Sequence, residues 1–427
     1  MENQMTNLEL APGITMHWVQ DKRYRENRLS IHLLTPLSRE AVTMNALLSG
    51  VLEKGSAKYP KMVDVGNRLA DLYGAYFSVT TGKSGPWQDI VLSVTSMAEE
   101  YTFSEEPILA ECAHFLLDTL LSPKVEGDGF SAEDVEVEKK ALQEEILSDI
   151  NNKRFYARKK CIEALLPGEV YALPRSGFVE DLPTITAQNL LTHYNELLKT
   201  ARIEIFGVGR DSFEKVVPIF QTALTLKNRT PILITTAERG SEEKKPVRIV
   251  QEKMDVSQTK LVLGFETAQA QNIREELAAR LFTGVFGASP NSKLFLHVRE
   301  ELGLCYYCSA SYDYYRSILL VDSGTDGSQK EKASEAILRQ LDEMKAGLFT
   351  ENDLFVAKKE MTDGFRGVYD EPGRVEGFYI GGLLSGLGGT PESRMKVMEE
   401  VERDELIAIA NRTHLQVIYT LTGEENE

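Results

Sequence analysis

The sequence predicts an α+β protein of two similar domains, each a mainly antiparallel sheet covered by helices. The 427 residues exceed what one hydrophobic core usually organises. One order of strands and helices occurs twice, before and after a polar stretch at 229–246 that has the composition of a linker. Strands often follow one another directly, which favours antiparallel pairing. We therefore expect similar domains at 1–228 and 247–427.

In the first half, a strand and then a helix are expected near the start. Residues 29–34 form a short apolar run typical of a strand. The apolar residues from Met44 to Leu52 are spaced to share one helix face, and Gly55 is placed to end that helix. Further strands are expected at 75–80, 90–95 and 203–208, and further helices at 64–72, 105–121, 131–148, 153–165 and 186–199.

The second half repeats this order. A strand at 260–265 leads to a helix at 273–286, as the first strand leads to the first helix. Strands are expected at 304–312, 317–323 and 417–421, and helices at 292–301, 329–346, 352–366, 374–385 and 404–412. The repetition predicts an internal duplication of one α+β unit.

Charge and composition disfavour several classes of partner. The chain carries 48 Lys and Arg against 65 Asp and Glu, a net charge of −17, and has no basic block. Nucleic acid and anionic membranes would be repelled. The start of the sequence has no secretory signal pattern, and no stretch has the length and apolarity of a membrane span. We expect a cytoplasmic protein with neither kind of partner.

The four cysteines do not predict a disulfide framework. Cys112 and Cys161 are expected to be buried thiols. Cys305 and Cys308 form a lone CxxC with no second pair or nearby histidine to complete a zinc site. They lie in the expected strand at 304–312, where residues three apart face opposite sides, so a structural role is the favoured interpretation.

Several short motifs occur in an order that resembles the pitrilysin/insulinase-like metallopeptidases, which carry the inverted zinc motif His-x-x-Glu-His. Each motif is weak alone, but their order and spacing extend over essentially the whole chain. The motifs are Glu53-Lys-Gly-Ser, Leu72-Tyr-Gly-Ala, Glu138-(x)6-Glu145-Ile, Gly177-Phe-Val-Glu-Asp-Leu-Pro-Thr-Ile-Thr, Phe286-Gly-Ala-Ser-Pro-Asn-Ser-Lys-Leu and Arg299-Glu-Glu-Leu-Gly-Leu-Cys-Tyr. The resemblance implies two α+β domains forming half of a peptidase clamshell, and it is greatest to inactive bacterial members.

The zinc motif itself is degenerate. Counting back from Lys54, the positions of the first histidine, the glutamate and the second histidine hold Ala46, Ser49 and Gly50. None of these can bind zinc through a nitrogen or act as a carboxylate base. The six histidines are too far apart in sequence to share a helical turn. We expect no catalytic residue and no metal in this chain.

Glu138 and Glu145 match the remaining acidic positions of the family's zinc site. They are seven residues apart, about two helical turns, and so project from one helix face. The resemblance implies that Glu145 stands at the third zinc-ligand position. Two interpretations stay open at this point: a solvated or vestigial acidic face, and carboxylates that line a substrate chamber.

Arg299 and Tyr306 match an Arg/Tyr pair that helps the family to grip substrate. A guanidinium and a phenol are suitable donors to a peptide carbonyl. The plainer alternative is that Arg299 pairs with a neighbouring glutamate while Tyr306 fills the core.

The resemblance implies a non-catalytic, substrate-binding subunit of a heterodimeric zinc peptidase. Its expected partners are a zinc-bearing paralogue, which would hold the only zinc, and a peptide or small-protein substrate. The isolated chain is then expected to have no peptidase activity. An alternative function is a homodimeric peptide-binding or scaffold protein without proteolysis, since an extended peptide can add to a sheet edge without any metal.

Overall fold

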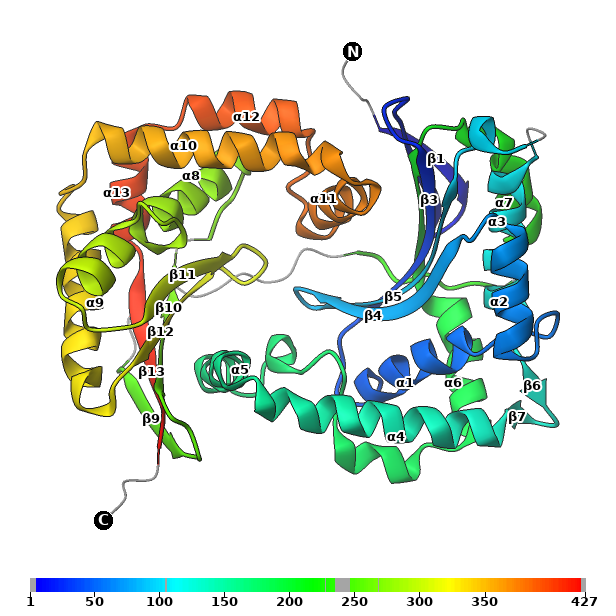
Figure 1. Cartoon of the computed structure of the whole chain (residues 1–427), viewed down its shortest axis with the longest axis horizontal. Coiled ribbons are helices and arrows are strands. Elements are labelled where there is room, and N and C mark those ends of the chain that lie inside the picture. Colours follow the sequence, from blue (N-terminus) through cyan, green and yellow to red (C-terminus); the bar gives the residue numbers. More distant parts are fainter. Residues whose placement is uncertain (1–4, 104–105, 227, 235–245, 268, 424–427) are drawn as a thin grey trace. The chain divides into compact units, whose positions relative to one another are not determined.

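The computed structural model describes all residues except 1–4, 104–105, 227, 235–245, 268 and 424–427 (Figure 1). Most of the predicted linker at 229–246 therefore lies outside the described residues. The contacts divide the chain into two compact units. The first unit comprises 1–147, 173–235 and 369–384, and the second comprises 148–172, 236–368 and 385–427. Each unit thus receives a short segment from the other half of the sequence.

The first unit is built on a six-stranded sheet with the order β1-β2-β8-β3-β5-β4. All neighbouring strands are antiparallel except β2 and β8, which are parallel. A separate two-stranded ribbon joins β6 and β7. The strands are β1 Thr6–Ala11, β2 Ile14–Gln20, β3 Glu26–Pro36, β4 Tyr76–Ser84, β5 Trp87–Met97, β6 Val125–Glu126, β7 Gly129–Phe130 and β8 Arg202–Gly209.

The central strand β3 is buried on both faces of this sheet. Leu29, Ile31 and Leu33 belong to the main apolar core. On one face of the sheet this core is completed by the helices α1 (Val42–Glu53), α3 (Ile108–Leu121) and α6 (Ala187–Thr200). Because side chains alternate along a strand, Ser30 and His32 point to the other face. That face carries buried polar groups and therefore requires polar partners.

Among the described residues of the first unit, six helices come from the first half of the chain and one comes from the second. The first six are α1 Val42–Glu53, α2 Met62–Asp71, α3 Ile108–Leu121, α4 Ala132–Ser148, α6 Ala187–Thr200 and α7 Val217–Ala223. The seventh, α11 Pro372–Ser385, belongs to the first unit over residues 372–384. Its Glu376 bonds Arg28 at 2.8 and 3.0 Å and lies 3.2 Å from His32. This helix supplies the polar partner that the second face of the sheet requires.

The second unit has a five-stranded sheet with the order β11-β12-β10-β13-β9, antiparallel except for the parallel pair β13 and β9. Counted from β4, the first sheet has the corresponding order β4-β5-β3-β8-β2, also ending in a parallel pair. The expected duplication is therefore visible in the topology. The strands are β9 Arg248–Lys253, β10 Thr259–Glu266, β11 Tyr307–Asp313, β12 Ile318–Thr325 and β13 His414–Thr422.

Helix α5 (Lys153–Leu165), from the first half of the sequence, covers one face of the second sheet. Its Ala157, Cys161 and Leu165 pack with Val262 and other residues of the sheet. Helices α8 (Ile273–Thr283) and α9 (Lys330–Lys345) lie over the opposite face (Figure 1). The unit also contains α10 Glu351–Arg366, α12 Pro391–Glu399 and α13 Arg403–Asn411, with two π-helical segments, η6 Gly284–Ala288 and η7 Leu294–Glu301.

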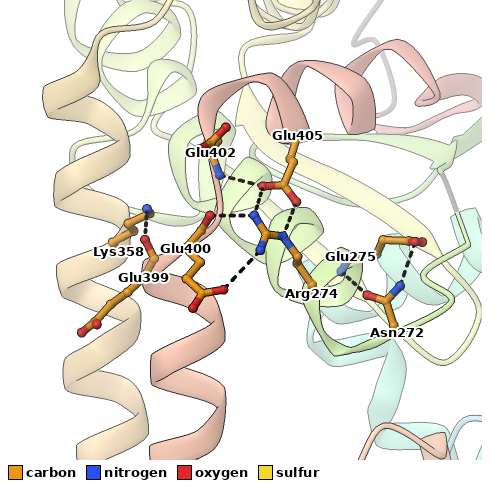
Figure 2. A network of polar contacts seen from close by, with 8 residues as sticks. All are labelled: Asn272, Arg274, Glu275, Lys358, Glu399, Glu400, Glu402 and Glu405. Atoms are coloured by element: carbon orange, nitrogen blue, oxygen red, sulfur yellow. Dashed lines mark hydrogen bonds and ion pairs between the residues drawn. The ribbon is translucent and has the colours of Figure 1, made fainter.

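A polar network ties four of these helices together (Figure 2). Arg274 of α8 bonds Glu405 of α13 at 2.8 and 3.1 Å and the carbonyl of Glu400 at 2.7 Å. The hydrogen bond from Arg274 lowers the pKa of Glu405. Lys358 of α10 donates to the carbonyl of Glu399, where α12 ends. The turn between α12 and α13 is therefore fixed at several points.

The predicted fold class is confirmed, with differences at particular elements. Strands β1, β2, β6, β7 and β9 and helices α7 and α12 were not predicted. Short 3₁₀ segments also occur, at Glu99–Tyr101, Asp149–Asn151, Val170–Ala172, Val179–Thr184, Phe213–Lys215, Gly327–Gln329 and Gly367–Asp370. No helix among the described residues is long and apolar enough to cross a membrane.

Candidate functional site

All five residues of the predicted degenerate metal site line one pocket of the first unit. The pocket has a volume of about 300 Å³. Helix α1 contributes Ala46, Ser49 and Gly50, and α4 contributes Glu138 and Glu145. Strand β4 and residues 175–176 complete its wall. We call this cavity the α1–α4 pocket.

Local sequence explains how α1 presents small residues to this pocket. Leu47, Leu48 and Leu52 are buried in the core, which fixes the rotation of the helix. The helix ends before Gly55, whose φ is 153° and whose added Cβ would lie 2.3 Å from the carbonyl of Tyr59. A side chain at that position would not fit.

Neither Ser49 nor Gly50 offers a metal ligand to the pocket. The Ser49 hydroxyl donates to the carbonyl of Ala46 at 2.8 Å, so it is used within its own helix. A Cβ added to Gly50 would lie 2.3 Å from Oε2 of Glu138. The Glu138 carboxylate thus occupies the space into which a side chain at position 50 would project.

The carboxylates of the pocket have hydrogen-bond and ion-pair partners that were not identified from the sequence. Lys54 lies 2.7 Å from Glu138, and Glu145 accepts a hydrogen bond from Ser176 at 2.8 Å. Glu53 accepts from the backbone amide of Val79 at 3.3 Å. Burial raises the pKa of Glu53, and the amide of Val79 opposes that shift. Lys54 was visible in the sequence only as part of the motif Glu53-Lys-Gly-Ser.

The side chains of this pocket do not fit the zinc that the family resemblance implies. Protein zinc sites take four ligands, chiefly from cysteine and histidine with carboxylates in addition. Among the pocket's lining residues the acidic side chains are Glu53, Glu138 and Glu145, and neither a histidine nor a cysteine is present. Within the described part of the chain, no group of three or more His, Cys, Asp or Glu residues is arranged to hold a metal ion.

Arg299 and Tyr306 lie in the second unit and are both accessible to solvent. Arg299, on η7, has its guanidinium 4.5 Å from the ring centre of Phe295 and 3.4 Å from a carboxylate oxygen of Glu300. Tyr306 is 60% exposed, and its hydroxyl donates to Asp326 at 3.1 Å. The core position considered for Tyr306 is therefore wrong, whereas the contact of Arg299 with a neighbouring glutamate is present.

Known proteins with similar sequences belong to the family that the motifs indicated. Residues 184–361 match the peptidase M16 inactive domain. The chain is 27% identical to "Probable inactive metalloprotease YmfF" of Bacillus subtilis (strain 168) over 413 residues, covering 97% of this chain and 96% of that protein. The chain is thus similar to proteins of the peptidase M16 family. The resemblance to pitrilysin/insulinase-like peptidases, and to their inactive bacterial members, is thereby confirmed.

Two solved structures share the fold of this chain over nearly its full length. A conserved protein from Enterococcus faecalis V583 superposes with a TM-score of 0.89 at 27% identity, covering 99% of each chain. The structure described as a peptidase M16 inactive domain from Pseudomonas fluorescens gives a TM-score of 0.81 at 18% identity, covering 98% of each chain.

The CxxC formed by Cys305 and Cys308 differs from its prediction. Strand β11 begins only at Tyr307, so Cys305 precedes the strand and the alternation argument does not apply to it. Both cysteines are free and buried. A hydrogen bond between their side chains lowers the pKa of Cys305 and raises that of Cys308. The expectation that the two thiols face opposite sides was wrong.

The first unit also contains a row of hydrogen-bonded side chains, Ser30, His32 and Asp89, that resembles a hydrolase triad. Ser30 Oγ lies 3.2 Å from Nε2 of His32, and Nδ1 of His32 lies 2.8 Å from Asp89. However, Glu376 also lies 3.2 Å from Nε2, and Ser30 is fully buried. A histidine held between two carboxylates stays protonated and cannot accept a proton from serine. We therefore interpret Ser30, His32 and Asp89 as a structural polar cluster and not as a catalytic triad.

This ionic cluster predicts a pH dependence of stability. Burial alone would lower the pKa of His32, but Asp89 and Glu376 outweigh burial and raise it from 6.5 to about 10. Burial would raise the pKa of Glu376, but His32 and Arg28 lower it from 4.5 to about 2. The histidine's contribution is complete below pH 6.5 and is lost as pH rises toward 10. The glutamate's contribution is complete above pH 4.5 and is lost as pH falls toward 2.

We therefore expect the free energy of unfolding of the first unit to fall by about 3 kcal/mol between about pH 6 and about pH 9. Urea unfolding followed by tryptophan fluorescence measures this, because both tryptophans, Trp18 and Trp87, are buried in the first unit. His32→Gln should remove most of the difference between the two pH values. An equal fall in that variant would show that other groups cause it.

Proposed function

We propose that this chain is the non-catalytic, substrate-binding subunit of a heterodimeric zinc peptidase, paired with a zinc-bearing paralogue. The observation that carries the proposal is an asymmetry between two sites. The residues that line the α1–α4 pocket include no histidine or cysteine, whereas an arginine and a tyrosine stand at positions 299 and 306 and both side chains reach solvent. In this assignment the paralogue supplies the metal and this chain helps to hold the peptide.

The surroundings of Arg299 and Tyr306 suit the binding of a peptide backbone. The ring of Phe295 lies beneath the Arg299 guanidinium and restricts its plane, which lowers the entropy lost when substrate binds. Tyr306 donates its proton to Asp326, so its oxygen lone pair is available to an amide N–H of the peptide. The guanidinium retains N–H groups for a peptide carbonyl.

Arg299→Ala should lower kcat/KM for peptide cleavage by the reconstituted heterodimer about tenfold. The reason is the loss of a charged donor to the substrate, while the zinc site of the paralogue is unchanged. The matched control is Arg339→Ala, which removes an exposed arginine of α9 in the same unit. Cleavage that is unchanged by Arg299→Ala would contradict the role assigned to Arg299.

A peptide-binding or scaffold role without proteolysis is the second candidate, and strand β4 favours it. This strand is the edge of the first sheet, and its Val79, Thr80 and Thr81 line the α1–α4 pocket. An extended peptide can add to such an edge through main-chain hydrogen bonds. Peptide binding by the chain alone, together with no cleavage after mixing with any zinc-bearing paralogue of the same genome, would favour this function.

A further inference from the structure

Three cationic side chains gather at the edge of the second sheet, around one buried carboxylate. Arg154 and Arg158, four residues apart on α5, both bond Asp322 of β12. Asp322 is 1% exposed, so at least one cation is needed to compensate its charge. The third cation, Lys260 of β10, lies 5.7 Å from the ring centre of Tyr307, which also lies 4.4 Å from the Arg154 guanidinium. We call Arg154, Arg158 and Lys260 the cationic cluster.

The cluster has more positive charge than its single carboxylate neutralises. Arg154 and Arg158 share Asp322, and among the described residues Lys260 forms no ion pair within 4.0 Å. Its ammonium instead donates to the amide oxygen of Gln258 at 2.5 Å. Burial lowers the pKa of Lys260, and the charge of Arg154 lowers it further. Three cations and one carboxylate leave a net charge of about +2 in a chain whose total is −17.

The arginines are held in place yet keep donors for a ligand. Arg154 also donates to Ser309 at 2.8 Å, and Arg158 donates to Ser311 at the same distance. These serines alternate along β11 and so face α5 together. The side chain of Arg154 is 49% exposed and that of Arg158 is 29% exposed, so their remaining N–H groups reach solvent. Pre-positioned guanidinium groups with free donors suit planar carboxylates.

We propose that the cationic cluster binds a carboxylate of an acidic peptide segment. The strand that carries Tyr307, Ser309 and Ser311 is the edge strand of its sheet, where an extended peptide can lie alongside. The ring of Tyr307 offers a surface to the apolar part of that peptide. If the cluster only fastened α5 to the sheet, one arginine on Asp322 would suffice, and the second arginine and Lys260 would add repulsion.

The test compares two nonapeptides that carry the same neutral fluorophore and differ only in having glutamate or glutamine at alternate positions. Fluorescence anisotropy with the full chain at low salt should show about tenfold tighter binding of the glutamate peptide. Lys260→Gln should reduce this preference severalfold without disturbing an ion pair. Arg154→Gln should do the same, since Arg158 still compensates Asp322. The preference should weaken at high salt.

Two matched controls carry the same charge changes elsewhere in the second unit: Lys332→Gln and Arg339→Gln, on exposed positions of α9. Circular dichroism establishes that each variant is folded. Equal binding of the two peptides would overturn the proposal, and so would an unchanged preference in folded Lys260→Gln. Displacement of the peptide by equimolar inorganic phosphate would overturn it in favour of a phosphate site. The test needs neither the paralogue nor zinc, so its failure leaves the proposed heterodimer untouched.

Discussion

Replacing Glu376 by glutamine should destabilise the first unit by about 3 kcal/mol. Glu376 is buried between His32 and Arg28, with a distance of 3.2 Å to the histidine and two hydrogen bonds from the arginine. Glutamine keeps the volume and one acceptor but removes the charge. Two cations are then left at this end of the cluster with Asp89 as the remaining carboxylate. Breaking a buried ionic network costs more than deleting an exposed pair, because the uncompensated charge stays in a poorly solvated site.

Urea unfolding with tryptophan fluorescence measures this loss in the unit that contains α11. Hydrogen exchange should show that the amides of α11 lose protection before those of β3, since Glu376 anchors the helix to the sheet. The control is Glu371→Gln, just before α11, whose exposed carboxylate lies 3.5 Å from Arg374. That variant should change stability by less than about 1 kcal/mol. Equal stability of the two variants would show that Glu376 does not anchor the helix.

Local patterns in the sequence were sufficient for most elements and for the composition of the pocket. The spacing of Met44 to Leu52 predicted α1, and the seven-residue spacing of Glu138 and Glu145 predicted one face of α4. These inferences depend only on helical periodicity, which tertiary contacts did not override. The motif positions around Lys54 then pointed to three small residues of α1, Ala46, Ser49 and Gly50, which all line this pocket.

Long-range pairings were not predictable in the same way. Nothing in the sequence around Pro372–Ser385 indicates that this helix belongs to the first unit, because its partners Arg28 and His32 lie more than 300 positions earlier. The assignment of α5 to the second unit was not predictable for the same reason, since its partners in the second sheet lie far along the chain. The contact between Cys305 and Cys308 was missed because it depends on where β11 begins, and strand ends are the least certain part of a sequence-based assignment.

The double substitution Ala46→His and Gly50→His should give the α1–α4 pocket about one bound zinc per chain. Two histidines four residues apart on α1 lie on one helix face, and Glu145 lines the same pocket as a third ligand. The new side chain at position 50 would meet the Glu138 carboxylate, which is the mobile end of its side chain. Moving it breaks a partly exposed pair with Lys54, at a cost of about 1 kcal/mol or less. Structural zinc binding contributes roughly 10 kcal/mol or more, so binding should prevail.

Elemental analysis after dialysis against zinc-free buffer measures the bound metal, and the wild-type chain gives the baseline. Ala46→His alone should stay at that baseline, because one imidazole and one carboxylate hold zinc weakly. Adding Glu145→Gln to the double substitution should lower the zinc content again, since it removes the third ligand from α4. A folded double variant that binds no more zinc than wild type would mean that the ion pair between Glu138 and Lys54 keeps zinc out even when both histidines are present. In that case the absence of a zinc site would depend on this ion pair as well as on the missing histidines.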